Sequence, residues 1–134
     1  GYGGWVRFIF KRHGSSQEIR LKFHHGFGAG GGSGKGVAHT MKYAVQNPDA
    51  HIVATGHTHD TYLLPLARER LSKSGEVYQD EQLHIRCGNY KNEYGDGSTG
   101  WAVEKGLTPK PLGAVWLRFF MRKKQIHYEA IRAT

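Results

Sequence analysis

The first quarter of the chain alternates apolar and polar positions in the way that β-strands do. Residues 5–11 combine aromatic and β-branched side chains, and residues 18–24 alternate apolar with polar or basic side chains. A polar turn at 13–16 separates the two segments. We therefore expect two antiparallel strands, of which the second is half-buried.

A helix is expected after a glycine-rich stretch, because apolar residues recur at helical spacing between positions 35 and 47. These residues are Val37, Met41, Ala44 and Val45. The dipeptide Asn47-Pro48 ends the helix, since the residue before a proline is driven out of the helical region. Residues 51–55 are largely apolar and predict a short strand.

The remaining chain is mostly strand. Residues 62–71 and 82–87 flank a polar turn, and residues 88–111 are polar and glycine-containing, with a short helical turn near Trp101. A hairpin over 112–121 and 125–131 follows. This order predicts a single α/β (α+β) domain with a mixed sheet, one main helix and a C-terminal β meander. Its core candidates are Trp5, Phe8, Phe10, Val115, Leu117 and Phe119.

Charge and composition narrow the classes of partner. The 134 residues carry 19 Lys and Arg against 11 Asp and Glu, a net charge of +8 that favours anionic partners. The single cysteine, Cys87, excludes an intramolecular disulfide and indicates a reducing, cytoplasmic setting. No apolar run approaches the roughly 20 residues that a membrane span needs, and the chain carries no secretory signal. No membrane partner is therefore expected. The start Gly1-Tyr2-Gly3-Gly4 resembles a point inside a longer chain.

Histidines gather where predicted strands end. Nine histidines occur in the chain, and His24, His25, His57 and His59 follow two neighbouring strands. Neutral imidazole is a common ligand of divalent transition metals. Because Gly56 permits a tight turn before the last pair, the sequence predicts imidazoles from two strand ends around one cleft.

These motifs resemble those of one family. Gly56-His57-Thr58-His59 is similar to the last signature of calcineurin-like metallophosphoesterases, and His24-His25-Gly26 resembles the signature before it. The glycine-rich continuation and residues 49–55 resemble the branch common in phages and bacteria. The resemblance covers roughly residues 5 to 120. It implies an αββα sandwich and hydrolysis of phosphomono- or phosphodiesters by a water that two metal ions activate.

The resemblance also assigns metal ligands. His57 and His25 would bind the second ion and His59 the first, with His24 as the alternative to His25. Thr58, Asp60 and Gly56 would lie beside these ligands and orient their rings. The complete enzyme would hold two divalent ions (Mn, Fe, Zn or Ni).

The family's carboxylate signatures are missing. Asp-x-His, Gly-Asp and Gly-Asn-His should precede the histidine motifs, but the residues before His24 contain no Asp. Residues 1–134 are therefore expected to be the C-terminal portion of the domain, holding at most one ion and inactive or very weak alone. Its partners would be the N-terminal half and a phosphorylated substrate, and apolar surface left bare could drive self-association.

The glycine-rich stretch has three interpretations. Residues 26–31 satisfy Gly-x-Gly-x-x-Gly, but the turn continues to Gly34 and no acidic residue follows at the spacing of a dinucleotide site. The pattern of a P-loop fails, because Gly36 follows Lys35 where Ser or Thr is needed. The third interpretation is phosphate binding before a helix. The contacts would be Gly28, Gly30, Gly31 and Lys35.

Basic residues on two predicted hairpins give the alternative function. Arg118, Arg122, Lys123 and Lys124 lie on the last hairpin, and Arg68, Arg70 and Lys73 lie on another. Solvated strand faces explain such charges in most proteins. The functional alternative is a non-catalytic domain that binds nucleic acid, or a nucleotide, through phosphate contacts.

Overall fold

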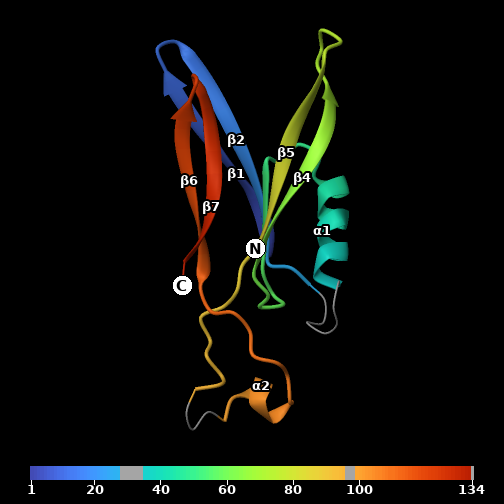
Figure 1. Ribbon diagram of the computed structural model, residues 1–134, viewed down its shortest axis with the longest axis vertical. Coiled ribbons are helices and arrows are strands. Elements are labelled where there is room, and N and C mark those ends of the chain that lie inside the picture. Colours follow the sequence, from blue (N-terminus) through green and yellow to red (C-terminus); the bar gives the residue numbers. More distant parts are fainter. Residues whose placement is uncertain (28–34, 96–98, 134) are drawn as a thin grey trace.

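The computed structural model describes residues 1–27, 35–95 and 99–133 of the chain (Figure 1). Its elements are β1 (Gly3–Arg12), β2 (Ser15–His24), α1 (Lys35–Gln46), β3 (Ile52–Thr55), β4 (Tyr62–Leu71), β5 (Val77–Arg86), α2 (Trp101–Glu104), β6 (Ala114–Arg122) and β7 (Gln125–Ala133). No helix in these ranges is long and apolar enough to cross a membrane.

Five strands form a mixed sheet in the order β1-β2-β3-β5-β4. The β1–β2 and β4–β5 pairs are antiparallel, whereas β3 runs parallel to both of its neighbours. The mixed α/β character predicted from the sequence is confirmed.

The predicted C-terminal meander is wrong, because β6 and β7 form a separate two-stranded sheet. Both edges of β5 are already paired, with β3 and β4, so the chain cannot add β6 beside it. Instead the segment after β5 leaves the sheet as a long excursion that carries α2 (Figure 1). An Asn89–Leu112 bridge closes the base of this excursion.

The β6–β7 hairpin covers one face of the sheet. The buried core on that face consists of Ile19, Leu21, Ile52, Leu83 and Ile85. Five of the six predicted core residues pack against it, and the Phe8 and Phe119 rings lie 4.7 Å apart. Trp5 is the exception. Successive side chains of β1 point to opposite faces, so Trp5 lies on the face opposite to Phe8 and Phe10, where it is 47% exposed.

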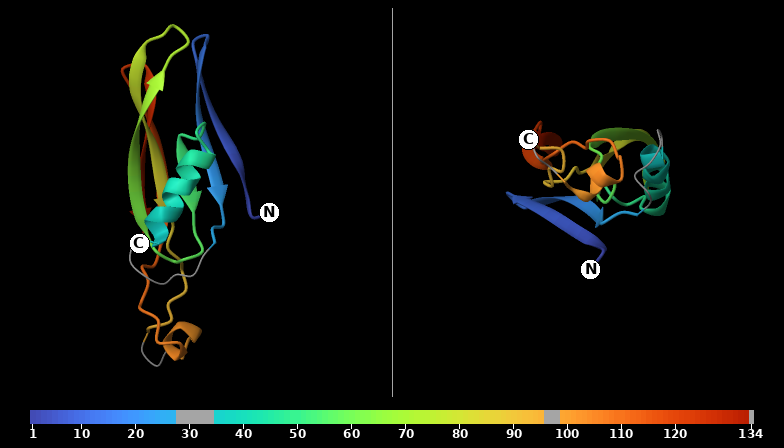
Figure 2. Two further views of the ribbon diagram at one scale, coloured as in Figure 1. Left: turned by 90° about the vertical axis from the view of Figure 1, so that its right-hand side faces the viewer. Right: turned by 90° about the horizontal axis from the view of Figure 1, so that it is seen from below.

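Helix α1 lies on the other face of the sheet (Figure 2, left). Its Tyr43 packs with Ala50 and Val53 in a second buried cluster. The apolar residues that predicted the helix do not make this contact: Val37, Met41 and Val45 are exposed. The helical period was therefore right, but the side of the helix that packs was not.

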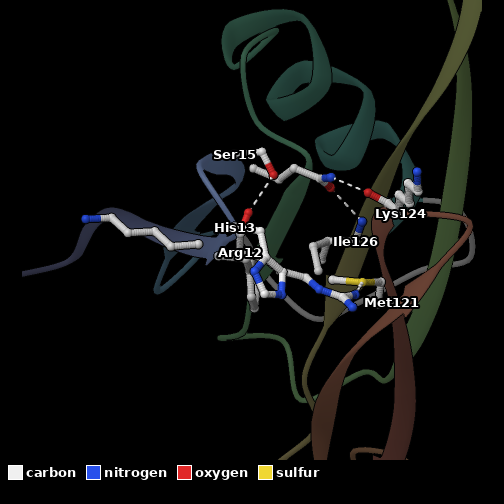
Figure 3. Close-up of a pocket in the computed structure, with 9 residues that line it drawn as sticks. Arg12, His13, Ser15, Met121, Lys124 and Ile126 are labelled. Carbon is white, nitrogen blue, oxygen red and sulfur yellow. Dashed lines mark hydrogen bonds between the residues drawn. The ribbon is translucent and has the colours of Figure 1, made fainter.

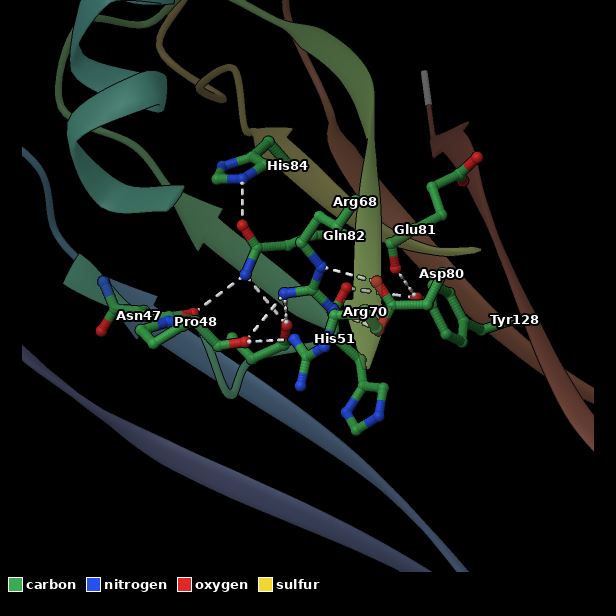
Figure 4. A network of polar contacts seen from close by, with 11 residues as sticks. Asn47, Pro48, His51, Arg68, Arg70, Asp80, Glu81, Gln82, His84 and Tyr128 are labelled. Carbon is green, nitrogen blue, oxygen red and sulfur yellow. Dashed lines mark hydrogen bonds and ion pairs between the residues drawn. The ribbon is translucent and has the colours of Figure 1, made fainter. Parts of the chain in front are cut away.

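A polar network fixes the α1–β3 connection to β4 and β5 (Figure 4). Arg68 forms a bidentate ion pair with Asp80 at 2.8 Å and donates to the carbonyls of Pro48 and Ala50. Arg68 was one of the candidate nucleic-acid contacts, but its charge is matched within the fold.

Two buried side chains complete this network. Gln82 Nε2 donates to the carbonyls of Asn47 and Ala50, and its Oε1 lies 2.8 Å from His84 Nε2. Burial, and then the nearby Arg68, lower the pKa of His84 to about 4. His84 is thus a neutral structural residue at physiological pH.

Candidate metal centre

The two histidine motifs meet because β2 and β3 are parallel neighbours. His24 at the end of β2 pairs with Thr55 at the end of β3, so both chains leave the sheet at the same edge. The backbone then continues the contact: Gly56 N donates to His25 O at 3.1 Å. Loops at the carboxyl ends of such strands are positions where α/β sheets commonly place ligand groups.

His25 and His57 form a close pair. His25 Nε2 lies 3.1 Å from His57 Nδ1, and the ring planes cross at 77°. One ring can donate a hydrogen bond to the other at this distance. Two nitrogens bound to one tetrahedral zinc ion are about 3.4 Å apart, so a small adjustment would convert this contact into shared coordination. Both side chains are exposed, which leaves them accessible to an ion.

His24 lies apart from this pair. Its Nδ1 lies 2.9 Å from Gly26 N and 3.0 Å from the hydroxyl of Tyr43 on α1. Successive residues of a strand face opposite sides of the sheet, so His24 is directed to the helix. Of the two alternatives left open by the sequence, the structure brings His25 to His57.

His59 does not join the pair. In the described ranges no three His, Cys, Asp or Glu side chains lie close enough to hold one metal ion. His57 and His59 both have left-handed backbone, with φ of 75° and 60°, and Thr58 between them is buried. The expected convergence of three imidazoles is therefore limited to two.

A buried arginine, which sequence reasoning missed, holds the loop between the histidines. Arg86 is 1% exposed, and its Nη1 donates to Gly56 O at 3.0 Å and to Thr58 Oγ1 at 2.9 Å. The guanidinium also lies 5.7 Å from the centre of the Tyr62 ring. Its one sequence signal is a basic residue directly before Cys87 at the end of an otherwise apolar-alternating strand.

The residues expected beside the ligands have other partners. Thr58 bonds to Arg86, and Asp60 accepts from Lys110 Nζ at 2.6 Å. A second carboxylate near His59 belongs to Glu93, whose pKa is lowered mainly by its hydrogen bond to Lys91 and slightly by His59. Both carboxylates are thus engaged by lysines.

The predicted phosphate contacts cannot be placed. Gly28, Gly30 and Gly31 lie outside the described residues. Lys35 begins α1, but its side chain also lies outside the description.

The donor set fits one ion better than two. His25 and His57 offer two neighbouring nitrogens, a partial coordination shell for a transition metal. Two ions about 3.5–4 Å apart would need bridging and terminal oxygen ligands. The two carboxylates described above, Asp60 and Glu93, are paired with Lys110 and Lys91.

Comparisons with models of known families, with curated proteins and with solved structures find no match to this chain. The resemblance to metallophosphoesterases therefore depends on the two histidine motifs and on their meeting in space.

Proposed function

We propose that this chain supplies the histidine side of a metal-dependent phosphoesterase site. The observation that supports the proposal is the 3.1 Å contact between His25 Nε2 and His57 Nδ1, from two loops 32 positions apart. Each histidine belongs to a motif that resembles a metal-ligand signature of that enzyme class, and the two motifs follow neighbouring parallel strands.

The chain's own residues would bind and orient. His25 and His57 would hold one divalent ion, and Arg86 keeps the His57 loop in place through Gly56 and Thr58. The bound ions of such sites activate a water and stabilise phosphoryl oxygens. His59 would bind the other ion of the pair, which is the first ion in the family's assignment, once carboxylates are supplied.

Those carboxylates would come from a partner segment outside residues 1–134. In this proposal the sheet and α1 form one half of an αββα sandwich, and a preceding half carries the Asp and Asn ligands. The chain alone would then bind metal without turning over substrate. Incubation with bis-p-nitrophenyl phosphate and Mn²⁺ should show no hydrolysis above buffer. Robust turnover would mean that the site is complete as it stands.

Metal titration tests the ligands directly. Calorimetric titration with Zn²⁺ should show one site in the unaltered chain. Removing an outer partner of a metal ligand typically weakens metal affinity by roughly 10–100-fold. His25→Ala and His57→Ala remove ligands themselves, so each should weaken zinc affinity by more than that.

His24→Ala is the matched control, because it removes a neighbouring imidazole that contacts Tyr43 instead. It should lower thermal stability and leave zinc affinity within about 3-fold, well short of the loss expected for a ligand. If His24→Ala abolished binding while His25→Ala preserved it, the assignment would be reversed. Unchanged binding in both His25→Ala and His57→Ala would refute the site.

A further inference from the structure

A second candidate site lies at the far end of the strands, where two hairpin tips meet (Figures 1 and 3). The β1–β2 turn lies beside the β6–β7 turn. Gln17 joins them, since its Nε2 donates to Lys124 O at 2.6 Å and its Oε1 accepts from Ile126 N at 2.7 Å. Arg12 Nη1 also reaches Met121 Sδ. The two tips therefore form one surface.

This surface contains a half-open cavity of about 370 Å³. Small-molecule sites span about 300–1,000 Å³, so the cavity can hold part of a ligand and not only water. Phe10, Met121 and Ile126 contribute its apolar wall, and the basic residues stand around it. The basic lining residues are Lys11, Arg12, His13 and Lys124.

The charge around the cavity is not matched by acids. Residues 1–17 and 105–128 contain no Asp or Glu. Within the described part of the chain, no ion pair involves the basic residues of the two tips, which are Lys11, Arg12, Arg122, Lys123 and Lys124. By contrast, Arg118 in the middle of β6 is paired with Glu129. Among the described residues of these two hairpins, Arg7, Arg20 and Arg118 farther along the strands are thus paired, whereas the basic residues of the tips are not.

Backbone conformation supports a functional origin of this charge. Lys123 and Lys124 form the two-residue β6–β7 turn with φ of 48° and 65°, a conformation for which Asn-Gly is preferred. Lysine gains no stability there, because a side chain in the left-handed region is strained. Strained residues cluster at ligand sites, and Lys124 lines the cavity, so its charge favours a ligand of the opposite charge.

We propose that the cavity binds single-stranded nucleic acid, with phosphates on the basic tips and one base against Met121 and Phe10. A flat basic surface would suit any polyanion, whereas a cavity with an apolar wall adds a place for a base. Bases of a duplex are paired and stacked, so a single strand fits better. This site is independent of the histidine pair.

The test uses a fluorescein-labelled oligothymidylate of about 20 nucleotides, longer than the 4–16 nucleotides that one small domain covers. The variant is Lys123→Asn/Lys124→Gly, which removes two charges and installs the preferred turn dipeptide, so it should fold at least as well. Lys42→Gln/Lys105→Gln removes two exposed charges that belong to neither basic hairpin, and is the matched control.

Fluorescence anisotropy at two salt concentrations gives the readout. Four phosphate contacts on a single strand give a slope of about −2.8 in log K against log salt, or about a 50-fold weakening from 50 to 200 mM. The turn variant should lose about 1.4 of that slope and weaken only about 7-fold over the same range. The control variant should keep the full slope.

The cavity itself is tested with an abasic oligonucleotide of equal length. Stacking of one base contributes roughly 5- to 150-fold in affinity, so the abasic probe should bind at least about 5-fold more weakly. Equal binding of the abasic probe, of heparin or of anionic vesicles would overturn the proposal in favour of an unspecific polyanion surface. Equal affinities of the turn variant and the unaltered chain would also overturn it. EDTA and His57→Ala should have no effect, which separates this result from the metal site.

Discussion

Replacing Thr58 by Val removes one hydroxyl from the loop between the candidate metal ligands and changes little else. Thr58 is 8% exposed, and its Oγ1 accepts from Arg86 Nη1 at 2.9 Å. Valine has the same branched shape, so no cavity of consequence opens. The substitution therefore isolates one hydrogen bond to a buried cation.

The expected cost follows from the surroundings of Arg86. A hydrogen bond to a charged group contributes about 1.5–3 kcal/mol, and a buried group left without a partner adds its desolvation cost. Arg86 Nε already has no hydrogen-bond partner among the described residues, and no described carboxylate pairs with the guanidinium. Only Gly56 O would remain for Nη1. We expect Thr58→Val to lower the free energy of unfolding by about 2 kcal/mol.

Urea denaturation followed by fluorescence measures this change. With a slope near 2 kcal/mol per molar, the midpoint should fall by about 1 M at constant slope. A double-mutant cycle with Arg86→Met should show the two effects to be coupled, because the partner of Thr58 is already gone in the second background. A loss below about 0.5 kcal/mol, or additive effects in the cycle, would show that the bond does not support the loop.

Two further predictions concern the same region and the buried network. Gly26→Ala should cost about 2 kcal/mol or more in urea denaturation, because φ is 99° and a Cβ would lie 2.7 Å from Gly56 O. Gly75→Ala, with φ of 86° and open space, should cost only the conformational strain of about 1–2 kcal/mol, so equal losses would refute the contact. Stability should also fall as pH drops from about 6.5 to about 4, because the unfolded chain protonates His84 while burial keeps its folded pKa near 4. The full loss in the free energy of unfolding is about 3 kcal/mol. In His84→Gln, the urea midpoint should change less with pH across that range. An unchanged pH dependence would show that other groups cause it.

Local sequence patterns were sufficient to predict most elements. Strand β4 begins and ends where the pattern placed it, and α1 ends one residue earlier than expected. Strand β5 extends five residues before its predicted start, because pairing with β4 continues through the polar run Gln79-Asp80-Glu81, which interrupts the apolar pattern. Such pairing is a property of the hairpin as a whole, which a one-strand pattern does not contain.

The sequence could not show which face of each strand or helix packs against the rest of the protein. Trp5 and the apolar stripe of α1 have the right periods, but the packed side of each element is decided by its neighbours in space. The same holds for the site. His24 and His25 have different partners because successive side chains of a strand point to opposite faces of the sheet. Arg86 lies under the loop because of the register of β2, β3 and β5.

The metal and nucleic-acid proposals can be judged separately because of the length of β2. His24 ends this strand and Ser15 begins it, so nine steps of about 3.3 Å place the two candidate sites about 30 Å apart along the sheet. Charges interact weakly beyond about 8–10 Å at physiological salt. A change of charge at the Lys123-Lys124 turn therefore acts on the histidine pair only by disturbing the fold, which the Asn-Gly substitution is designed to avoid. If zinc affinity and oligonucleotide affinity changed together in that variant, the independent sites inferred here would have to be one connected surface.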